Sequence, residues 1–332
     1  MGIKLTDLVE KKPLKWDQLK GKKLAIDAQN VIFQFLSSIR QQDGAPLTDD
    51  DGNITSHLIG LFSRVPNLMQ KGITPIFVFD GEAPELKENI RIIRRKTKAK
   101  AKENYIHAKE EEDFEQMHKY SRQLSVLNED MIEESKELLN ALGLPTVQAP
   151  SEAEAQCAHM CKKKIVWATA SQDFDTLLFG SPKLIQNLTL AKTRKFQGRT
   201  IPVSPQLIEL NELLDKLELN QEELIVLGIM VGTDFNPKGI KGIGPKKALK
   251  LLQSGKKFER IFEELETDFD WEEILNIFKN IPIEDEKPKK QLYDSEKIKE
   301  ILIERHDFSE ERVDKTLSKI NNKENSSLKR WF

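Results

Sequence analysis

The sequence predicts an α/β protein with a mainly parallel central sheet flanked by helices on both faces. Short apolar runs, each followed by an acidic residue, alternate with longer amphipathic segments. The runs have the length of strands and the segments the length of helices, which is the rhythm of βαβ units. The 332 residues are 38% hydrophobic and 32% charged, which is enough apolar material for a large core under a heavily charged surface.

Four apolar runs are expected to form strands of the sheet. In parallel sheets, ligands bind beyond the carboxyl ends of the strands, so the acids that follow these runs lie where a site is expected. The runs with their acids are Leu24–Ile26 with Asp27, Ile76–Phe79 with Asp80, Leu144–Val147 with Glu152, and Ile165–Ala168 with Asp173.

The stretch between Glu85 and Leu142 has helical spacing and no strand pattern. Its first part is basic, with eight Lys or Arg against the single acid Glu88 between Lys87 and Lys102, and Glu110–Glu115 is acidic. A net charge of −2 excludes a globally basic nucleic-acid binder, so attraction to phosphate has to come from such a local patch. A helical hairpin without substrate contact is the structural alternative.

Helices and a glycine-rich hairpin are expected in the second half of the chain. Pro205–Leu219 and Gln221–Val231 are predicted to be helices, and the hairpin Lys238–Pro245 leads into a further helix, Lys246–Gln253. Glycines between two helices let backbone amides approach a bulky anion, for which phosphate is the natural candidate. Helical packing alone is expected from Phe258 to Ser318.

Seven carboxylates recur at the ends of the expected elements. Two unit charges 4 Å apart repel by about 4 kcal/mol at an effective dielectric constant of 20, so a cluster of them needs cations. Oxygen ligands without histidine or cysteine select Mg²⁺, or Mn²⁺ in its place. The seven are Asp27, Asp80, Glu152, Glu154, Asp173, Asp175 and Asp234.

Local geometry makes further predictions for these acids. Asp173 and Asp175 would point to the same side of an extended segment, whereas Glu152 and Glu154 on a helix would diverge. Ser151–Glu154 also has the pattern of a capping box, which explains Glu154 structurally. The residues alone do not divide the acids between ions. Hard divalent ions beside a basic segment indicate phosphoryl transfer with two metals, and no protein nucleophile is evident.

The ordered series of motifs resembles the flap endonucleases, a structure-specific 5′ nuclease family, in an archaeal-like form. The match extends from Gly2 to about Gln253. It rests on Leu24–Ala28, Phe77–Gly81, Ala149–Ala155, Ser171–Asp175, Gly232–Phe235 and Gly242–Pro245. The resemblance implies hydrolysis of DNA at the base of a 5′ flap, with 5′-3′ exonuclease activity, in Okazaki fragment processing and DNA repair.

The resemblance also implies roles for individual residues. Asp27, Asp80, Glu152 and Glu154 would hold one Mg²⁺, and the other three acids would complete the second site. Lys87 and Arg94 would reach the scissile phosphate from a helical arch or gateway (residues 82–131). The residues implied to contact DNA are Gly2, Phe33, Arg95, Gly239, Lys241, Gly242, Gly244 and Lys246, the last five in a helix-hairpin-helix-type element that often holds a monovalent cation.

Residues near the carboxyl end resemble the sliding-clamp binding box of replication proteins. Leu328, Trp331 and Phe332 would enter a hydrophobic pocket of the clamp, and Asn325 stands where the box usually has glutamine. The expected organisation is one nuclease domain (1–318) and a flexible tail (319–332). Within the domain, 1–81 and 132–257 carry the motifs, 238–244 binds duplex, and 258–318 packs. We expect an intracellular protein, monomeric alone and without a membrane span.

Two other functions compete with the nuclease. Asp173–Thr176 resembles the aspartyl-nucleophile loop of haloacid-dehalogenase-type phosphatases, although Leu177 departs from that motif. A non-catalytic adaptor between DNA and the clamp would need the hairpin and the tail, but not all seven acids. Cys157 and Cys161 would share one face of a helix as small buried residues.

Overall fold

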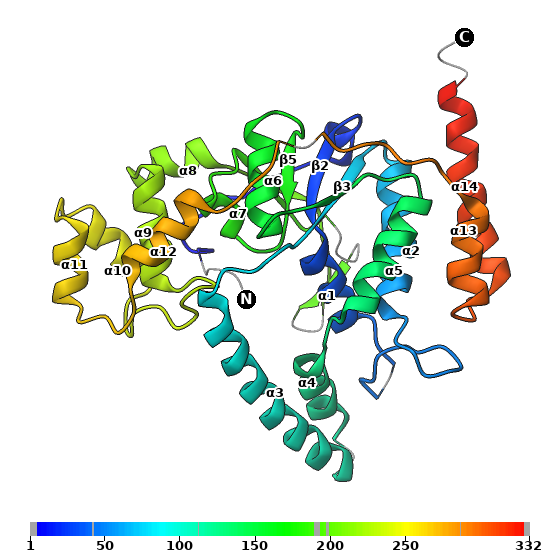
Figure 1. The fold of residues 1–332 in the computed structure, drawn as a ribbon, viewed down its shortest axis with the longest axis horizontal. Helices are drawn as coiled ribbons and strands as arrows, with labels where there is room; N and C mark the ends of the chain where they lie inside the picture. The colour runs from blue at the N-terminus through cyan, green and yellow to red at the C-terminus, as the bar shows by residue number, and fades with distance from the viewer. Residues whose placement is uncertain are drawn as a thin grey trace.

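The computed structural model describes residues 5–328 apart from residues 42, 112, 189–192, 197–198 and 286. It does not describe the side chains of residues 88–96, 110, 114, 118, 122, 193–196, 199–202 and 321–328. Within the described residues, a sheet of seven strands lies between helices on both sides (Figure 1). The predicted α/β architecture is therefore confirmed.

The central sheet has the order β1-β9-β6-β5-β2-β3-β4. Its five strands from β6 to β4 are parallel, while β9 is antiparallel to both β6 and β1 at the other edge. The seven strands are β1 (Lys12–Pro13), β2 (Lys23–Asp27), β3 (Thr74–Phe79), β4 (Thr146–Gln148), β5 (Ala168–Ala170), β6 (Lys183–Gln186) and β9 (Gln206–Glu209).

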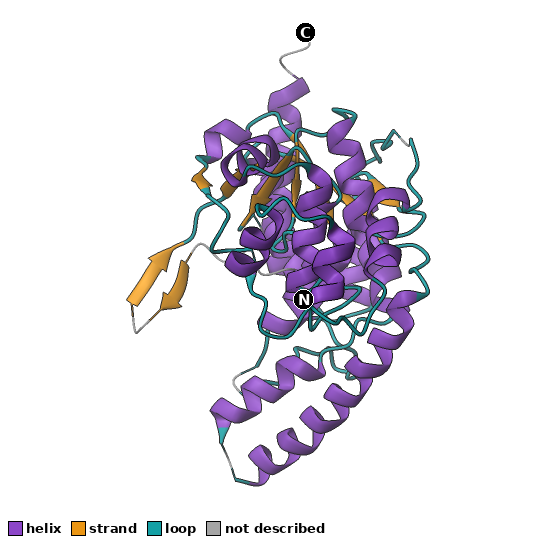
Figure 2. Ribbon diagram, turned by 90° about the vertical axis from the view of Figure 1, so that its left-hand side faces the viewer, coloured by secondary structure: helices purple, strands orange, loops and turns teal. Residues whose placement is uncertain are grey.

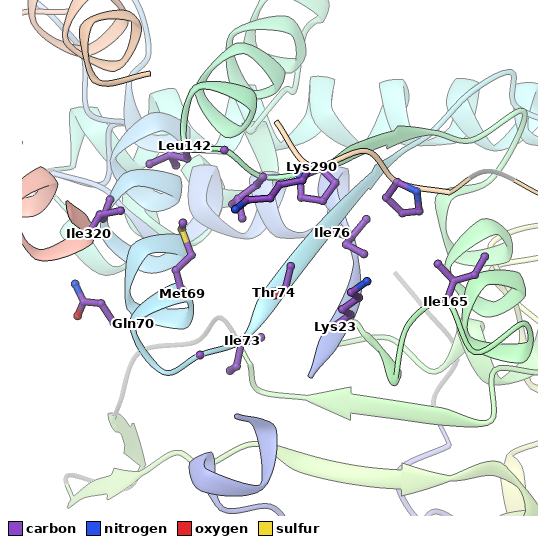
Figure 3. A pocket seen from close by; sticks show the side chains of 15 residues that line it. Lys23, Met69, Gln70, Ile73, Thr74, Ile76, Leu142, Ile165, Lys290 and Ile320 are labelled. Atoms are coloured by element: carbon purple, nitrogen blue, oxygen red, sulfur yellow. The ribbon is translucent and has the colours of Figure 1, made fainter. Parts of the chain in front are cut away.

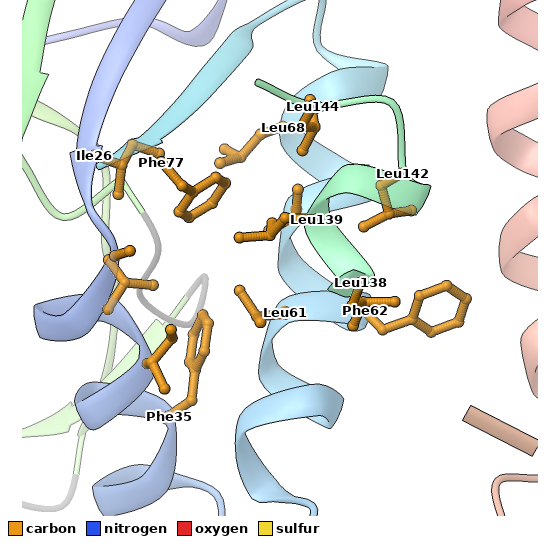
Figure 4. Close-up of a cluster of buried hydrophobic side chains, with 14 of the residues drawn as sticks. Ile26, Phe35, Leu61, Phe62, Leu68, Phe77, Leu138, Leu139, Leu142 and Leu144 are labelled. Atoms are coloured by element: carbon orange, nitrogen blue, oxygen red, sulfur yellow. The ribbon is translucent and has the colours of Figure 1, made fainter. Parts of the chain in front are cut away.

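Alternating side chains of the central strands supply two hydrophobic cores. Leu24 and Ile26 of β2 face a core built with α1 (Ala28–Ser38), α2 (Ser56–Gln70) and α5 (Glu129–Ala141), as Figure 4 shows. Ala25, between them, faces the opposite core beneath α6 (Ala153–Lys162). Strands buried on both faces are typical of parallel sheets in α/β proteins. The carboxyl ends of β2, β3, β4 and β5 are thereby held rigidly together.

A third core surrounds the antiparallel edge of the sheet. It joins β6 and β9 to a group of helices at one end of the molecule, on the left of Figure 1. These helices are α7 (Asp175–Leu178), α8 (Leu210–Leu217), α9 (Gln221–Val231), α10 (Pro245–Leu252), α11 (Phe258–Glu264) and α12 (Trp271–Asn280). Cys157 and Cys161 are both buried on α6 and unbridged, as predicted.

The charged stretch after β3 is helical, as predicted. The long helix α3 (Leu86–Glu110) and the shorter α4 (Phe114–Leu124) pack against each other and project below the body in both overall views (Figures 1 and 2). Asn128 then caps α5, its side chain accepting a hydrogen bond from the Met131 amide at 2.9 Å. The chain returns to the body at α5, which packs against α2.

Several predictions of local structure were wrong. Residues 206–209 form strand β9 instead of the start of a helix, because they pair with both β6 and β1. The strand predicted at Ile165–Ala168 begins only at Ala168 and ends at Ala170. Strand β6 was not predicted, nor was the ribbon of β7 (Thr193–Phe196) and β8 (Arg199–Pro202) that stands out from the body (Figure 2).

The residues after α12 close the fold. After α12 the chain returns past the sheet to a short helix α13 (Ser295–Lys299), a π-helical turn (Glu300–Glu304) and α14 (Glu310–Leu328). Helix α14 packs against α2 and continues to Leu328, so the first part of the predicted flexible tail is helical. Among the described residues, no helix is both long enough and apolar enough to cross a membrane.

Candidate metal centre

The fold brings the seven predicted acids to one edge of the sheet. Asp27 ends β2, Asp80 follows β3, Glu152 precedes α6, and Asp175 begins α7. Their electrostatic coupling shows the convergence, since Asp80, Asp173 and Glu152 all act on Asp27. Glu154 is acted on by Asp175, Asp27, Asp173 and Asp234. Acids as far apart in the sequence as Asp27 and Asp234, which are separated by 207 positions, therefore belong to one electrostatically interacting cluster.

The loops that carry Asp80 and Glu152 are joined by a close backbone contact. The Gly81 amide donates to the Ser151 carbonyl at 2.6 Å, and the Ser151 hydroxyl donates to the Glu82 carbonyl at 2.8 Å. A β-carbon on Gly81 would lie 2.1 Å from the Ala149 carbonyl oxygen, so only glycine allows this approach. The carboxylate of Asp80 in turn accepts a hydrogen bond from the Ala153 amide at 2.7 Å.

A further site residue, Asn30, was missed by the sequence analysis. Its backbone N–H donates to Asp27 Oδ1 at 3.0 Å, and its side-chain Nδ2 donates to Asp173 Oδ2 at 2.9 Å. Asn30 therefore joins the acid at the end of β2 to the acid beyond β5. Its place three residues after Asp27, at the start of an expected helix, was the available signal.

Two expectations about local geometry are corrected. Asp173 and Asp175 do not share an extended segment, because Asp175 is the first residue of α7. Residues 151–154 do not form a capping box, since Glu152 is the N-cap residue of α6 without a side-chain cap and Ser151 bonds to Glu82. The carboxylate of Glu152 is therefore not used as a helix cap.

Burial and mutual repulsion make several of these acids hard to ionise. Removal from water, and then the charge of Glu152, raises the pKa of Asp80 to about 6. Burial and then Asp80 raise the pKa of Asp27 well above its usual range. Burial and then Asp175 do the same for the pKa of Glu154. A divalent cation would reverse this penalty.

Among the side chains that the structure describes, Lys87 is the basic residue that contacts the acid cluster. Its ammonium group contacts Glu152 Oε2, lies 3.9 Å from Asp234 Oδ2, and stands 5.4 Å from the centre of the Phe235 ring. Burial by itself would lower the pKa of Lys87, but attraction to Glu152 and Asp234 outweighs it and raises the pKa. The first turn of α3 thus delivers a permanent positive charge to the acids.

The donor set fits hard divalent ions. All seven side chains offer carboxylate oxygens, and burial followed by repulsion between acids raises the pKa of Asp27, Asp80 and Glu154, which a divalent cation would oppose. Among the described residues, no three histidine, cysteine, aspartate or glutamate side chains are yet grouped closely enough to hold one ion. Carboxylates that repel one another are expected to stay apart in this way.

The charge deficit predicts that one acid destabilises the metal-free fold. The folded pKa of Asp80, about 6, lies above its ordinary 3.8, so stability falls as pH rises between these values and the full cost persists above pH 6. Asp80→Asn keeps the acceptor for Ala153 and removes the charge. Because Asp80 is only partly buried, we expect a gain of about 1–2 kcal/mol at pH near 8.

Thermal unfolding of Asp80→Asn in EDTA would test this expectation. The variant should unfold at a higher temperature than the unsubstituted protein near pH 8, and the difference should shrink toward pH 4, where both side chains are neutral. The exposed acid Asp17, in the turn before β2, gives the matched control Asp17→Asn. A lower unfolding temperature for Asp80→Asn near pH 8 would show that the acid cluster is not strained.

The remaining predicted DNA-binding residues lie outside the acid cluster or outside the described side chains. Phe33 on α1 is 41% exposed, so its ring is not part of the core. Lys241, Gly242 and Gly244 are exposed between α9 and α10, and Lys246 is exposed in the first turn of α10. No atom lies within 4 Å of a β-carbon built on Gly242 or Gly244. Gly2 and the side chains of Arg94 and Arg95 lie outside the described parts.

A pocket of about 520 Å³ lies at the opposite edge of the sheet (Figure 3). Lys23 and Thr74, at the amino ends of β2 and β3, line it together with Met69, Leu142 and Ile320. No acidic residue lines this pocket. This pocket therefore offers no carboxylate ligand for a metal ion.

Comparisons with known proteins agree with the site. Residues 1–102 match the XPG N-terminal domain, and residues 143–234 match the XPG I-region. These two regions contain the seven acids and Lys87. The fold and the acid cluster together define a metal-dependent nuclease of the XPG class.

Similar proteins narrow the class to one family. The chain is 44% identical to flap endonuclease 1 of Thermococcus onnurineus and 45% identical to that of Pyrococcus furiosus, over all of this chain and 99% of each protein. The solved flap endonuclease-1 from Methanococcus jannaschii is 41% identical, with a TM-score of 0.77 over 97% of this chain and 98% of that one. This chain belongs to the flap endonuclease family. Neither the phosphatase nor the adaptor alternative is favoured.

Proposed function

We propose that this enzyme hydrolyses the phosphodiester at the base of a 5′ flap, using two Mg²⁺ ions held by the seven acids. The observation that carries the proposal is the convergence of these acids around Lys87 at the carboxyl edge of the sheet. Mn²⁺ would substitute, because it accepts the same oxygen ligands. The products would carry a 5′-phosphate and a 3′-hydroxyl. Removal of short fragments from a 5′ end by the same reaction would give the exonuclease activity.

The family resemblance assigns Asp27, Asp80, Glu152 and Glu154 to one ion, and Asp173, Asp175 and Asp234 to the second. Asp80 and Glu152 act on Asp27, which supports the first group. Asp173 also acts on Asp27, and Asp175 acts on Glu154, which supports two ions close to each other. When bound, the ions supply positive charge for the scissile phosphate and make the attacking water more acidic.

Lys87 and Arg94 would supply further positive charge to the phosphate. Lys87 stands between Glu152 and Asp234, and divalent ions that neutralise these acids would leave its ammonium group free to pair with substrate. Helices α3 and α4 would form the gateway for the 5′ strand. Arg94, two turns after Lys87, falls on the same helix face.

The body would hold the rest of the DNA. Phe33 offers an exposed ring on which the terminal base at the junction can stack. Gly239 has a positive φ of 53° and approaches the end of α9 so closely that a β-carbon would meet the Val231 carbonyl at 2.4 Å. That tight turn exposes Lys241, Gly242, Gly244 and Lys246 to the duplex, with a monovalent cation as a further ligand of the loop.

Cleavage of an end-labelled double-flap DNA tests the proposed function. Cutting at the junction is expected in Mg²⁺ and not in EDTA, and single strands and blunt duplexes should be cut much more slowly. Binding of the flap without cleavage in Mg²⁺ would support the adaptor instead. Equal cutting of flaps, single strands and ends would contradict the gateway.

The carboxyl-terminal box predicts a separable interaction with a sliding clamp. Leu328 ends α14, and Trp331 and Phe332 follow beyond the described residues. Replacing both aromatic residues with alanine should weaken clamp binding by about 10–100-fold, because they are the large apolar anchors of the box. Flap cleavage without the clamp should stay unchanged.

Asn325 provides a matched test in the opposite direction. Asn325→Gln lengthens the side chain by one methylene and should tighten clamp binding, which can be followed by titration calorimetry. Unaltered clamp affinity after loss of both Trp331 and Phe332 would exclude the box as the binding element.

A further inference from the structure

Arg40 joins the end of α1 to the end of α4. It follows Ile39, the C-cap residue of α1, and its guanidinium Nη1 donates to the Gly44 carbonyl at 2.8 Å. Nη1 also donates to the Ser121 hydroxyl, and Nη2 donates to the Ser125 hydroxyl. One planar side chain therefore contacts three segments of the chain.

The two serines are built into this contact. Ser121 and Ser125 are 6% and 8% exposed, respectively, and the Ser121 hydroxyl donates in turn to the Gly44 carbonyl. The tight turn that presents this carbonyl requires Gly44, whose φ is 84°. Buried hydroxyls need partners, and Arg40 provides one for each of them.

The position of Arg40 also suits the electrostatics of α4. Ser121 lies in the last turn of α4 and Ser125 directly after its end at Leu124. The last carbonyls of a helix carry partial negative charge, so a guanidinium group there is favourable. A lysine could supply the charge but not the fork that reaches two hydroxyls at once.

Helix α1 reaches the acid cluster at its other end. Asp27 is its N-cap residue, and Asn30 in its first turn bonds to Asp173. Helix α4 packs against α3, where Ala101 and Ala108 are buried, and α3 begins next to Lys87 in the cluster. The α3–α4 pair is thus attached to the body at Lys87 and at Arg40.

We propose that Arg40 is a positioning residue for the reaction, which anchors α4 to α1 and so holds α3 with Lys87 over the scissile phosphate. The proposal rests on the flap-cleaving function proposed above. Without the anchor, α4 would be held to the body mainly by its packing against α1, and the fraction of bound complexes with Lys87 in place would fall. The expected defect lies in kcat rather than in duplex binding.

Two variants test the anchor from its two sides. Arg40→Ala should lower kcat for a double-flap substrate by about 10–100-fold while KM changes by less than about threefold. The double variant Ser121→Ala with Ser125→Ala leaves Arg40 in place and should show the same pattern. Arg40→Lys should restore little, because it restores charge without the fork. Wild-type kcat in either of the first two variants would overturn the proposal.

Amide hydrogen exchange gives a readout that does not depend on cleavage. Residues 98–124 should exchange at least about tenfold faster in both variants, while β2 and β3 keep their protection. Unchanged exchange in these residues would refute the anchor even if activity fell. If Arg40→Ala is inactive, Arg40→Lys is active and the serine variant is normal, Arg40 contacts DNA directly and the positioning role is wrong.

The same experiments separate this proposal from the proposed function. If the unsubstituted enzyme failed to cut flaps, the proposed function would fall, whereas the exchange measurement would still decide whether Arg40 anchors α4. Thermal unfolding of each variant shows whether the body remains folded, and the serine variant removes only two hydroxyl groups.

Discussion

Asp175→Ala is expected to lower the rate of flap cleavage by at least about 10³-fold, which corresponds to about 4 kcal/mol of transition-state stabilisation. Asp175 is 4% exposed at the start of α7 and lies in the same field as Glu154. Its removal takes one carboxylate from the proposed second ion. The fold should tolerate the change, since a cluster short of positive charge loses one negative charge.

Single-turnover cleavage of the double flap in Mg²⁺, beside flap binding in EDTA, measures this effect. Binding should stay within about threefold of that of the unsubstituted protein, because DNA affinity comes mainly from contacts to the phosphate backbone. Asp17→Ala, an exposed acid in the turn before β2, is the control and should cleave normally. Retention of more than a tenth of the activity by Asp175→Ala would remove this residue from the metal centre.

Lys87→Ala is expected to slow cleavage by about 10²–10³-fold, the usual cost of removing one preorganised charge from a developing anion. Lys87 Nζ already stands among the acids, 3.9 Å from Asp234 Oδ2, so its helix delivers it to the place where the phosphate would bind. The loss should appear in kcat, because the charge acts on the transition state more than on the bound duplex.

Lys87→Ala should be less stable than the unsubstituted protein without Mg²⁺ and nearly as stable with it. In EDTA the variant should unfold at a lower temperature, since Glu152 loses a counter-charge, and Mg²⁺ should remove most of the difference. Lys87→Arg keeps the charge and should recover part of the activity, and Lys20→Ala, an exposed lysine far from the acids, should match the unsubstituted enzyme. Normal cleavage by Lys87→Ala would exclude it from the reaction.

Much of the fold could be predicted because each central strand carries its own pattern. Leu24–Ile26 and Ile76–Phe79 are continuous apolar runs, the pattern of strands buried on both faces, and both became parallel neighbours. The acids after them could be assigned to a common edge because parallel strands end on the same side. The motif series then identified the family.

The antiparallel edge of the sheet could not be predicted from local sequence patterns. Residues 206–209 lie in an amphipathic segment that favours a helix locally, yet they pair with β6 and β1. Whether such a segment becomes a strand depends on which partners the rest of the fold presents, and a single segment does not contain that information. The start of β5 shifted for the same reason, since its register is set by β2 and β6.

The order of residue types was enough to predict the class of protein, the seven candidate acids and the basic helix, because it encodes both strand periodicity and ligand chemistry. The tertiary structure alone decided how these residues act on one another. It placed Asn30 between Asp27 and Asp173, raised the pKa of Asp80, put Lys87 against Glu152 and fastened α4 to α1 through Arg40. These are contacts between segments distant in the sequence, and their energies depend on distance and burial, which only the folded chain defines.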